Sequence, residues 1–134
     1  MSAHFLGLRT VKYRAPDIQR ARDWYTEVLG FGPYFDQPFY VGFSVGGFEL
    51  GLDPDLTEPG VGEGSVTVYW GVAHAGASLA RLLGLGAVAR SPVQDVGGEI
   101  KVATVFDPFG NVLGIIENPH FQYQPPPQVR AASS

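Results

Sequence analysis

Glu49 is the residue of this sequence best placed to do chemistry. It lies in Phe48-Glu49-Leu50, an apolar stretch typical of a short strand. A carboxylate held in a cleft can act as a general base or contribute one ligand to a divalent metal. Two cationic residues, Lys12 and Arg14, alternate along a second predicted strand and would share one of its faces. A guanidinium suits bidentate contact with a carboxylate, so an anionic ligand is one option.

Few other residues could hold a metal or act as a nucleophile. The sequence has no Cys, which excludes a disulfide framework and a thiolate metal site. Its histidines are dispersed: His4 lies near the N-terminus, His74 at the start of a predicted helix and His120 beyond the last predicted strand. Zn, Fe and Ni sites need several imidazole or carboxylate donors. We therefore expect these histidines to be exposed or capping residues rather than ligands.

The composition is that of an ordinary globular protein. The 134 residues, 45% of them hydrophobic and 16% charged, suit one domain with a moderate core. The net charge is -4 and the basic residues are scattered, so a nucleic-acid partner is not expected. No apolar segment approaches the length of a membrane span, and the first residues lack the pattern of a signal peptide. These features predict a cytoplasmic protein without a membrane partner.

The first half of the chain predicts the order β-α-β-β-β. A strand is expected over 6–14, followed by a helix that begins after Asp17 as N-cap and ends at Gly30 as C-cap. Three short strands are then expected, over 34–36, 39–45 and 48–52. A Pro- and Gly-rich segment, 53–64, is expected to link this half to the next.

The second half repeats this order, which argues for an internal duplication. A strand over 65–72 and a helix over 75–84 precede three strands, over 87–93, 99–105 and 112–117. Between the last two strands lies Asp107-Pro108-Phe109-Gly110-Asn111, a run of turn-forming residues that predicts a tight hairpin. The residues after 120 include three consecutive prolines and predict an extended tail.

This last hairpin resembles that of a known superfamily. A strand, then Asp-Pro-x-Gly-Asn, then an apolar strand ending in Glu117 is similar to the end of the vicinal-oxygen-chelate superfamily, which includes glyoxalase I, extradiol dioxygenases, fosfomycin-resistance enzymes and bleomycin-binding proteins. A second match lies in the first half, where Ala15-Pro16-Asp17 leads into Trp24 to Phe31 and resembles the first helix of the family. Together the two matches span residues 8 to 120.

The resemblance implies an α+β fold built from two βαβββ modules, the glyoxalase-like (vicinal-oxygen-chelate) fold. Module one would comprise residues 6–54 and module two residues 65–120, with an extended tail over 121–134, all in a single domain over 1–134. In the family, the sheets of two modules enclose a cavity that holds a divalent metal. Members with two modules in each chain are often homodimers, so a homodimer is expected here.

The metal-ligand positions of the family carry mostly unsuitable residues in this chain. Carried over by position, they fall on Thr10, Glu49, Thr67 and Gly114. A threonine hydroxyl is a weak ligand for a divalent ion and glycine has no side chain, so only Glu49 could serve. The sequence therefore predicts a site without metal and without another cofactor.

Strand alternation predicts which side chains would line the cavity instead. The expected ligand-binding residues are Thr10, Lys12, Arg14, Glu49, Thr67, Tyr69 and Gly114. Alternatively, Lys12 or Arg14 pairs with Glu49, and Tyr69 is a packing residue. Three glycines on the same faces, Gly51, Gly71 and Gly114, are expected to leave room for a ligand. The aromatic cluster Phe35, Phe39, Tyr40 and Phe43 is expected at the cavity mouth or at a dimer contact.

Three hypotheses for function follow. The first is a metal-free, small-molecule-binding protein of unknown specificity, similar to the bleomycin-binding members of the family. The second is an enzyme of the same superfamily, a lyase, isomerase or dioxygenase, in which Glu49 acts as base or as partial metal ligand. The third is a structural or protein-interaction domain, which would fill the cavity with large side chains. An open pocket beside Glu49 would count against the third.

Overall fold

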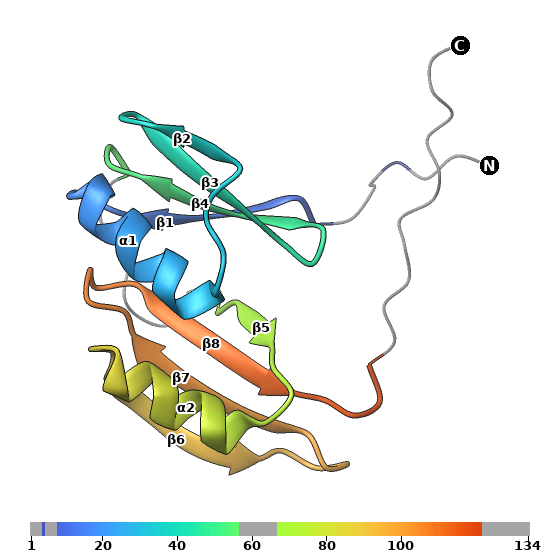
Figure 1. The fold of residues 1–134 in the computed structure, drawn as a ribbon. Coiled ribbons are helices and arrows are strands. Elements are labelled where there is room, and N and C mark those ends of the chain that lie inside the picture. The colour runs from blue at the N-terminus through green and yellow to red at the C-terminus, as the bar shows by residue number, and fades with distance from the viewer. Residues whose placement is uncertain (1–3, 5–7, 57–66, 122–134) are drawn as a thin grey trace.

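The chain folds into two four-stranded sheets, each with one helix. The computed structural model describes residue 4, residues 8–56 and residues 67–121 (Figure 1). Sheet A has the strand order β1-β4-β3-β2, and sheet B has the order β5-β8-β7-β6. In both sheets the first strand is parallel to the last, and the other pairs are antiparallel. The α+β fold with two βαβββ modules is therefore confirmed.

The elements follow the expected order with small shifts at their ends. Module one contains β1 (Thr10–Arg14), α1 (Ile18–Leu29), β2 (Phe35–Gln37), β3 (Tyr40–Val45) and β4 (Phe48–Asp53). Module two contains β5 (Tyr69–Gly71), α2 (Ala75–Gly84), β6 (Val88–Asp95), β7 (Lys101–Phe106) and β8 (Val112–Glu117). The first strand of each module begins later than expected. Parts of the predicted strands (6–7 and 65–66), of the linker (57–64) and of the tail (122–134) lie outside the described residues.

Helix α1 begins and ends where its capping residues predict. The Asp17 carboxylate accepts a hydrogen bond from the backbone N–H of Arg20, 3.2 Å away. Gly30 has a positive φ of 85°, a conformation that glycine adopts without a steric penalty, and its N–H closes the last turn on Thr26. Ala21 and Tyr25 on the inner side of this helix are fully buried. Local sequence and packing thus agree for this element.

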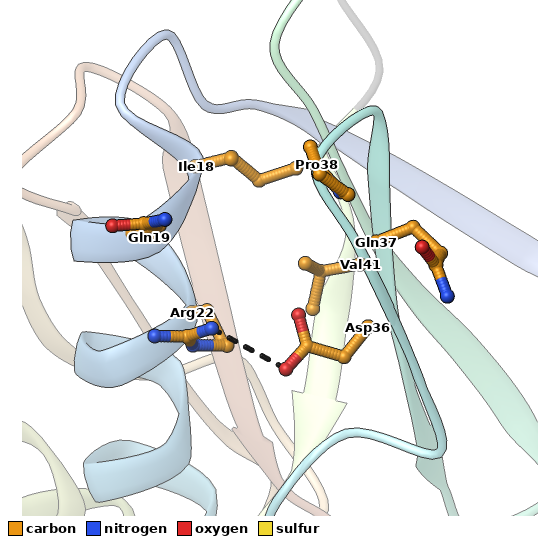
Figure 2. A pocket seen from close by; sticks show the side chains of 7 residues that line it. All are labelled: Ile18, Gln19, Arg22, Asp36, Gln37, Pro38 and Val41. Atoms are coloured by element: carbon orange, nitrogen blue, oxygen red, sulfur yellow. Dashed lines mark hydrogen bonds and ion pairs between the residues drawn. The ribbon is translucent and has the colours of Figure 1, made fainter.

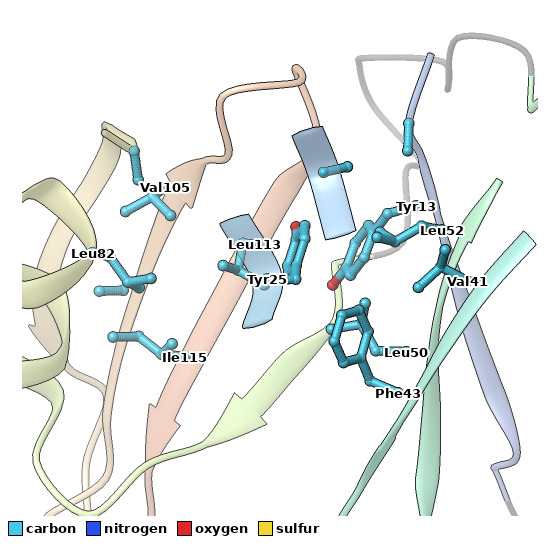
Figure 3. Packing of buried hydrophobic residues seen from close by; sticks show 14 residues of the cluster. Tyr13, Tyr25, Val41, Phe43, Leu50, Leu52, Leu82, Val105, Leu113 and Ile115 are labelled. Atoms are coloured by element: carbon cyan, nitrogen blue, oxygen red, sulfur yellow. The ribbon is translucent and has the colours of Figure 1, made fainter. Parts of the chain in front are cut away.

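One hydrophobic core joins the two modules. Its buried residues include Tyr25, Phe43 and Leu50 from module one and Leu82 and Ile115 from module two, as Figure 3 shows. Helix α1 lies between sheet A and sheet B (Figure 1). The helix-covered faces of the two sheets therefore share the core, and the opposite face of each sheet is left on the outside. We call these the outer faces.

The Asp107–Asn111 turn does more than close a hairpin, because it also fastens module two to module one. Asp107 is buried and accepts hydrogen bonds from the Tyr25 hydroxyl (2.6 Å) and from the side-chain amide of Asn111 (2.8 Å). The same Asn111 side chain accepts from the Arg14 N–H (2.9 Å) and donates to the Arg14 carbonyl (2.8 Å). Helix α1 and strand β1 are therefore both tied to this turn.

The two helices are joined at their C-terminal ends. Arg81 on α2 donates hydrogen bonds to the carbonyls of Glu27 (2.7 Å) and Val28 (2.8 Å) in the last turn of α1. Trp24 on α1 donates from its indole N–H to the carbonyl of Leu85, 2.7 Å away. These bonds satisfy carbonyls that a helix end leaves without partners. No helix in the described part of the chain is long and apolar enough to cross a membrane.

Candidate functional site

Four of the predicted ligand-binding residues lie on the outer face of sheet A. The parallel register pairs Thr10 with Glu49, Lys12 with Gly51 and Arg14 with Asp53, so the side chains of these residues lie on one face. Residues of the opposite parity, such as Tyr13, are buried in the core. Strand alternation therefore assigned these side chains to the correct face.

Glu49 is the centre of a hydrogen-bond cluster on this face. Its Oε1 accepts from the hydroxyls of Thr10 (3.0 Å) and Tyr40 (2.7 Å), and its Oε2 accepts from the hydroxyl of Tyr34. All three donors are uncharged. A pocket of about 320 Å³ lies beside the carboxylate, lined by Arg9, Thr10, Tyr34, Ser44, Gly47, Phe48 and Glu49.

The hydroxyl donors keep Glu49 ionised. Burial raises the pKa of this carboxyl, but the hydrogen bonds from Tyr34, Tyr40 and Thr10 together outweigh burial and lower its pKa below the ordinary value. The pKa of Tyr40 is raised, first by burial and then by its bond to Glu49. The pKa of Tyr34 is raised chiefly by its bond to Glu49. The tyrosines therefore remain protonated donors, and Glu49 remains an acceptor with a weak affinity for protons.

The residues at the metal-ligand positions of the family do not fit a divalent metal. Glu49 already accepts three O–H groups, whose hydrogen atoms occupy the directions that a metal would need. Thr10 is one of the donors, and Gly114 offers no side chain. Among the described residues no group of three His, Cys, Asp or Glu side chains could hold a metal ion.

The two cations of the outer face are held differently. Lys12 makes an ion pair with Asp53, with 3.0 Å between Nζ and Oδ2. The alternative prediction that Lys12 pairs with Glu49 is therefore wrong. The hydrogen bond from Lys12 leads the contributions that lower the pKa of Asp53. Arg14 is half-buried and its backbone is bound by Asn111, whereas its guanidinium makes no hydrogen bond or ion pair within the described residues. Arg14 is thus the cation still available to a ligand.

Two of the three glycines expected to leave room are covered by tyrosines. A Cβ atom at Gly51 would lie 2.0 Å from the Tyr40 hydroxyl oxygen, because the Tyr40 ring lies across this glycine. A Cβ atom at Gly114 would lie 2.5 Å from the carbonyl of Val68 and 2.8 Å from the Tyr69 ring. Of these three glycines, only Gly71 would have no atom within 4 Å of an added Cβ atom. The expected room at Gly51 and Gly114 is therefore absent.

Tyr34 is a site residue that the sequence prediction missed, and Tyr40 was expected at the cavity mouth or at a dimer contact but not as a partner of Glu49. Tyr40 lies across Gly51, and the Tyr34 ring and the Glu49 carboxylate lie over Gly42, where a Cβ atom would be 2.6 Å from Oε2. An aromatic residue that covers a glycine of a neighbouring strand is a known device of β-sheets. Gly42 and Gly51 on adjacent strands were therefore the available signal.

The predicted residues of module two form a second group on sheet B. Tyr69 is opposite Gly114 in the parallel register, and its side chain is 43% exposed. Thr67 precedes β5 and is partly buried. The pocket beside Glu49 is lined by residues of module one, and within the described residues no hydrogen bond or ion pair joins the two groups. One chain therefore presents the predicted site as two separate halves.

The aromatic cluster divides between the two sides of sheet A. The rings of Phe35 and Phe39 have centroids 6.1 Å apart, and those of Phe35 and Tyr40 are 6.2 Å apart. Phe39 is 64% exposed. Phe43 instead lies in the core against Tyr25, so its predicted place at a cavity mouth or dimer contact is wrong. Alternation explains the difference, because Tyr40 and Phe43 have opposite parity along one strand.

A further pocket, between α1 and the β2–β3 hairpin, carries no candidate chemistry. It has a volume of about 230 Å³ and is lined by Ile18, Gln19, Arg22, Asp36, Gln37, Pro38 and Val41 (Figure 2). Its charged side chains are paired with each other, with 3.3 Å between Arg22 Nη1 and Asp36 Oδ2. The pocket beside Glu49 is therefore the stronger candidate.

Solved structures share this fold at low sequence identity. A glyoxalase-related enzyme from Fulvimarina pelagi has a TM-score of 0.70 and 20% identity, over 96% of this chain and 100% of that chain. TioX from Micromonospora sp. ML1 has a TM-score of 0.65 and 21% identity, over 84% and 98%. A glyoxalase/bleomycin resistance protein/dioxygenase from Nocardioides has a TM-score of 0.65 and 18% identity, over 96% and 92%.

The family assignment comes from sequence. No curated protein matches the chain. The model of one family matches residues 4–115, and this range contains the first-helix motif and the Asp107–Asn111 turn of the last hairpin. The expected resemblance is thereby confirmed: the chain belongs to the Glyoxalase/Bleomycin resistance protein/Dioxygenase superfamily.

Proposed function

We propose that the protein binds a small molecule at the outer face of sheet A and does so without a resident metal. The observation that carries this proposal is the Glu49 cluster. Three hydroxyls fix an ionised carboxylate beside a pocket of about 320 Å³, a size within the range of ligand sites. A fixed acceptor of this kind orients a ligand, because the hydrogen bonds hold the carboxylate in one geometry before binding.

We further propose that a second copy of the chain completes the site. The two predicted halves, one around Glu49 and one around Tyr69, lie on different sheets of one chain. A homodimer in which the outer faces meet would bring Tyr69, Thr67 and Gly114 of one copy toward Glu49 of the other. The exposed side chains of Phe39 and Tyr69 support this arrangement, because burying them would remove apolar surface from water.

The ligand class is proposed from the remaining cation. Arg14 retains its full donor capacity on the outer face, whereas Lys12 is engaged by Asp53. Arg14 and Glu49 lie four residues apart along paired strands, about 13 Å between their backbones, so a carboxylate long enough to reach Arg14 with its anionic group and Glu49 with a hydroxyl or N–H donor would satisfy both residues. Thr10 is already bound to Glu49 and would act by holding that carboxylate.

The geometry gives less support to an enzyme that uses Glu49 as general base. A general base works best when its pKa lies near the working pH, whereas the pKa of Glu49 is lowered. Use of Glu49 as a metal ligand would require Thr10, Tyr34 and Tyr40 to turn their hydroxyls away. A binding role uses the carboxylate as it stands.

The test combines metal analysis with a ligand screen. Untagged protein is analysed for bound metal, and its melting temperature is followed during titration with Zn, Ni, Mn and Fe(II). We expect no bound metal and no stabilisation, since only a ligand that binds the native state raises the melting temperature. Metal bound by the wild type and lost on Glu49→Ala would overturn the metal-free proposal.

The ligand is then sought with a library of small carboxylates, by the same thermal measurement. Hits are expected to lose most of their stabilising effect in Arg14→Gln and Glu49→Gln. The control is Arg20→Gln, because Arg20 lies on α1 rather than on an outer face, and its guanidinium is 5.5 Å from the centroid of the Phe109 ring. Hits that act equally on all the variants would place the ligand elsewhere and refute the proposed site.

A further inference from the structure

A third cavity lies between the two modules, and it shares no lining residue with the pocket beside Glu49. Its volume is about 310 Å³. Its walls come from both modules and include Tyr25, Leu50, Trp70, Leu82, Leu113 and Ile115. All of these except Trp70 are buried core residues. Other lining residues, such as Phe31 and Arg81, are exposed, so the cavity opens at the surface and reaches into the common core.

The aromatic side chains in the walls of this cavity already use their polar groups. The Tyr25 hydroxyl is used by Asp107, 2.6 Å away, and the indole N–H of Trp70 donates to the Tyr13 hydroxyl at 2.9 Å. Burial raises the pKa of Tyr13 to about 12 although the bond from Trp70 opposes this rise, so Tyr13 stays a neutral acceptor. The end of the cavity that reaches into the core is therefore apolar, and an apolar cavity is a poor place for water.

Two polar side chains on α2 also line this cavity. The Ser78 hydroxyl makes no hydrogen bond within the described part of the chain. Arg81 uses one N–H each of Nη1 and Nη2 on the carbonyls of Val28 and Glu27, which leaves its Nε–H and two further N–H groups. An apolar interior with a hydroxyl and a guanidinium on one helix suits a molecule with an apolar body and one acidic head.

We propose that this inter-module cavity is a second binding site, for a small aromatic acid whose ring lies among the core residues and whose carboxylate lies at Arg81. The volume is within the range of known ligand pockets. A surface of another protein would not reach walls that belong to the buried core, so a small molecule is the occupant that fits. The site does not depend on the function proposed for the outer face.

The test is calorimetric titration of the intact protein with 2-naphthoate, which has an apolar double ring and one carboxylate. We expect saturable binding by the wild type. Ser78→Phe places a ring in the cavity from α2 and should weaken binding by about tenfold or more. Ala77→Phe is the matched control: it adds the same ring to the neighbouring residue of α2, which is exposed and does not line the cavity, and it should leave the affinity unchanged.

Further variants keep the outcome decisive. Val28→Phe fills the cavity from α1 and replaces Ser78→Phe if the latter does not fold, as judged by circular dichroism. Arg20→Gln, on α1 and outside the lining of both pockets, should bind 2-naphthoate like the wild type. Absence of saturable binding by the wild type, or wild-type affinity in a folded cavity-filling variant, would overturn the inference. Binding lost in Glu49→Gln or Arg14→Gln would assign the probe to the outer face and would equally overturn it.

Discussion

Asp107 is a buried carboxyl group whose oxygens are satisfied by hydrogen bonds. It is almost completely buried, and its two oxygens accept four hydrogen bonds, from the Tyr25 hydroxyl, the Asn111 amide, and the backbone N–H groups of Phe109 and Asn111. A buried polar group is costly unless it has hydrogen-bond partners, and here they come from within the chain. Each donor therefore matters more than a hydrogen bond at the surface.

The Tyr25 hydroxyl can be removed with little change of volume. We predict that Tyr25→Phe lowers the free energy of unfolding by about 1.5–3 kcal/mol, because it leaves one acceptor of a buried carboxylate without its donor. Urea denaturation measures this change. Tyr69→Phe is the control, since the Tyr69 hydroxyl makes no hydrogen bond in the described structure, and it should change stability by less than about 0.5 kcal/mol. Equal effects of both substitutions would refute this account of Asp107.

The lowered pKa of Glu49 predicts that the free energy of unfolding depends on pH in the acidic range. Burial raises its pKa, but the three hydroxyl bonds bring the folded-state pKa below the reference value of 4.5. Its contribution is therefore fully present above the unfolded-state pKa and is lost as the pH falls through the folded-state pKa. We predict that the wild type is more stable than Glu49→Gln at about pH 6 and that this difference shrinks toward about pH 3. A difference in unfolding free energy that is constant with pH would contradict the ionised, hydroxyl-bound state.

Among the elements, β5 and β8 are held close by a glycine. Gly114 on β8 lies close to the backbone of Val68, the residue before β5. Its N–H donates a hydrogen bond to the Val68 carbonyl at 3.1 Å, and the Tyr69 ring lies beside it. Sequence alternation assigned Gly114 to the outer face but could not show that Val68 and Tyr69 occupy the space next to it. That contact depends on a parallel pairing between residues far apart in the chain.

We predict that Gly114→Ala destabilises the protein by at least about 1–3 kcal/mol, the usual cost of overpacking. The added methyl would lie 2.5 Å from a backbone carbonyl, which cannot turn away as a side chain can, so β5 must separate from β8. Gly71→Ala on the same face is the control and should be tolerated, because a Cβ atom there meets nothing within 4 Å. Thermal unfolding of the two variants measures the difference. A similar melting temperature for both would show that β5 is not held in this register.

Local signals predicted most of the elements and few of the contacts between them. Asp17 and Gly30 fixed the ends of α1 because capping is decided within one turn of helix. The Asp107–Asn111 run likewise predicted a hairpin turn. Its bonds to Tyr25 and Arg14 were not predictable, because they join residues 82 and 97 positions apart. The partners of Glu49 were missed for the same reason, since ring placement over glycines depends on strand register.

At the scale of the whole molecule, the proposed dimer gives a prediction for Phe39. This residue is 64% exposed on the β2–β3 hairpin. We predict that the wild type sediments as a dimer and that Phe39→Glu shifts it toward the monomer, because a charge placed in an apolar contact must be desolvated. Leu83→Glu is the control: Leu83 is an exposed leucine on α2, away from both outer faces, and its replacement should leave the dimer intact. A monomeric wild type would refute the proposed completion of the site by a second copy.

The shared core also predicts that the two modules unfold together. Each module has one tryptophan, Trp24 on α1 and Trp70 on β5, so Trp24→Phe leaves a probe of module two and Trp70→Phe a probe of module one. Within each variant, we expect tryptophan fluorescence and far-ultraviolet circular dichroism to give the same urea midpoint, the mark of a single cooperative transition. The physical reason is that Asp107, Asn111 and Arg81 bind module one from module two, so neither module keeps its hydrogen bonds when the other unfolds. Separate midpoints for the two probes would mean that each sheet and its helix form an independent folding unit, and the junction at the Asp107–Asn111 turn would then contribute little to stability.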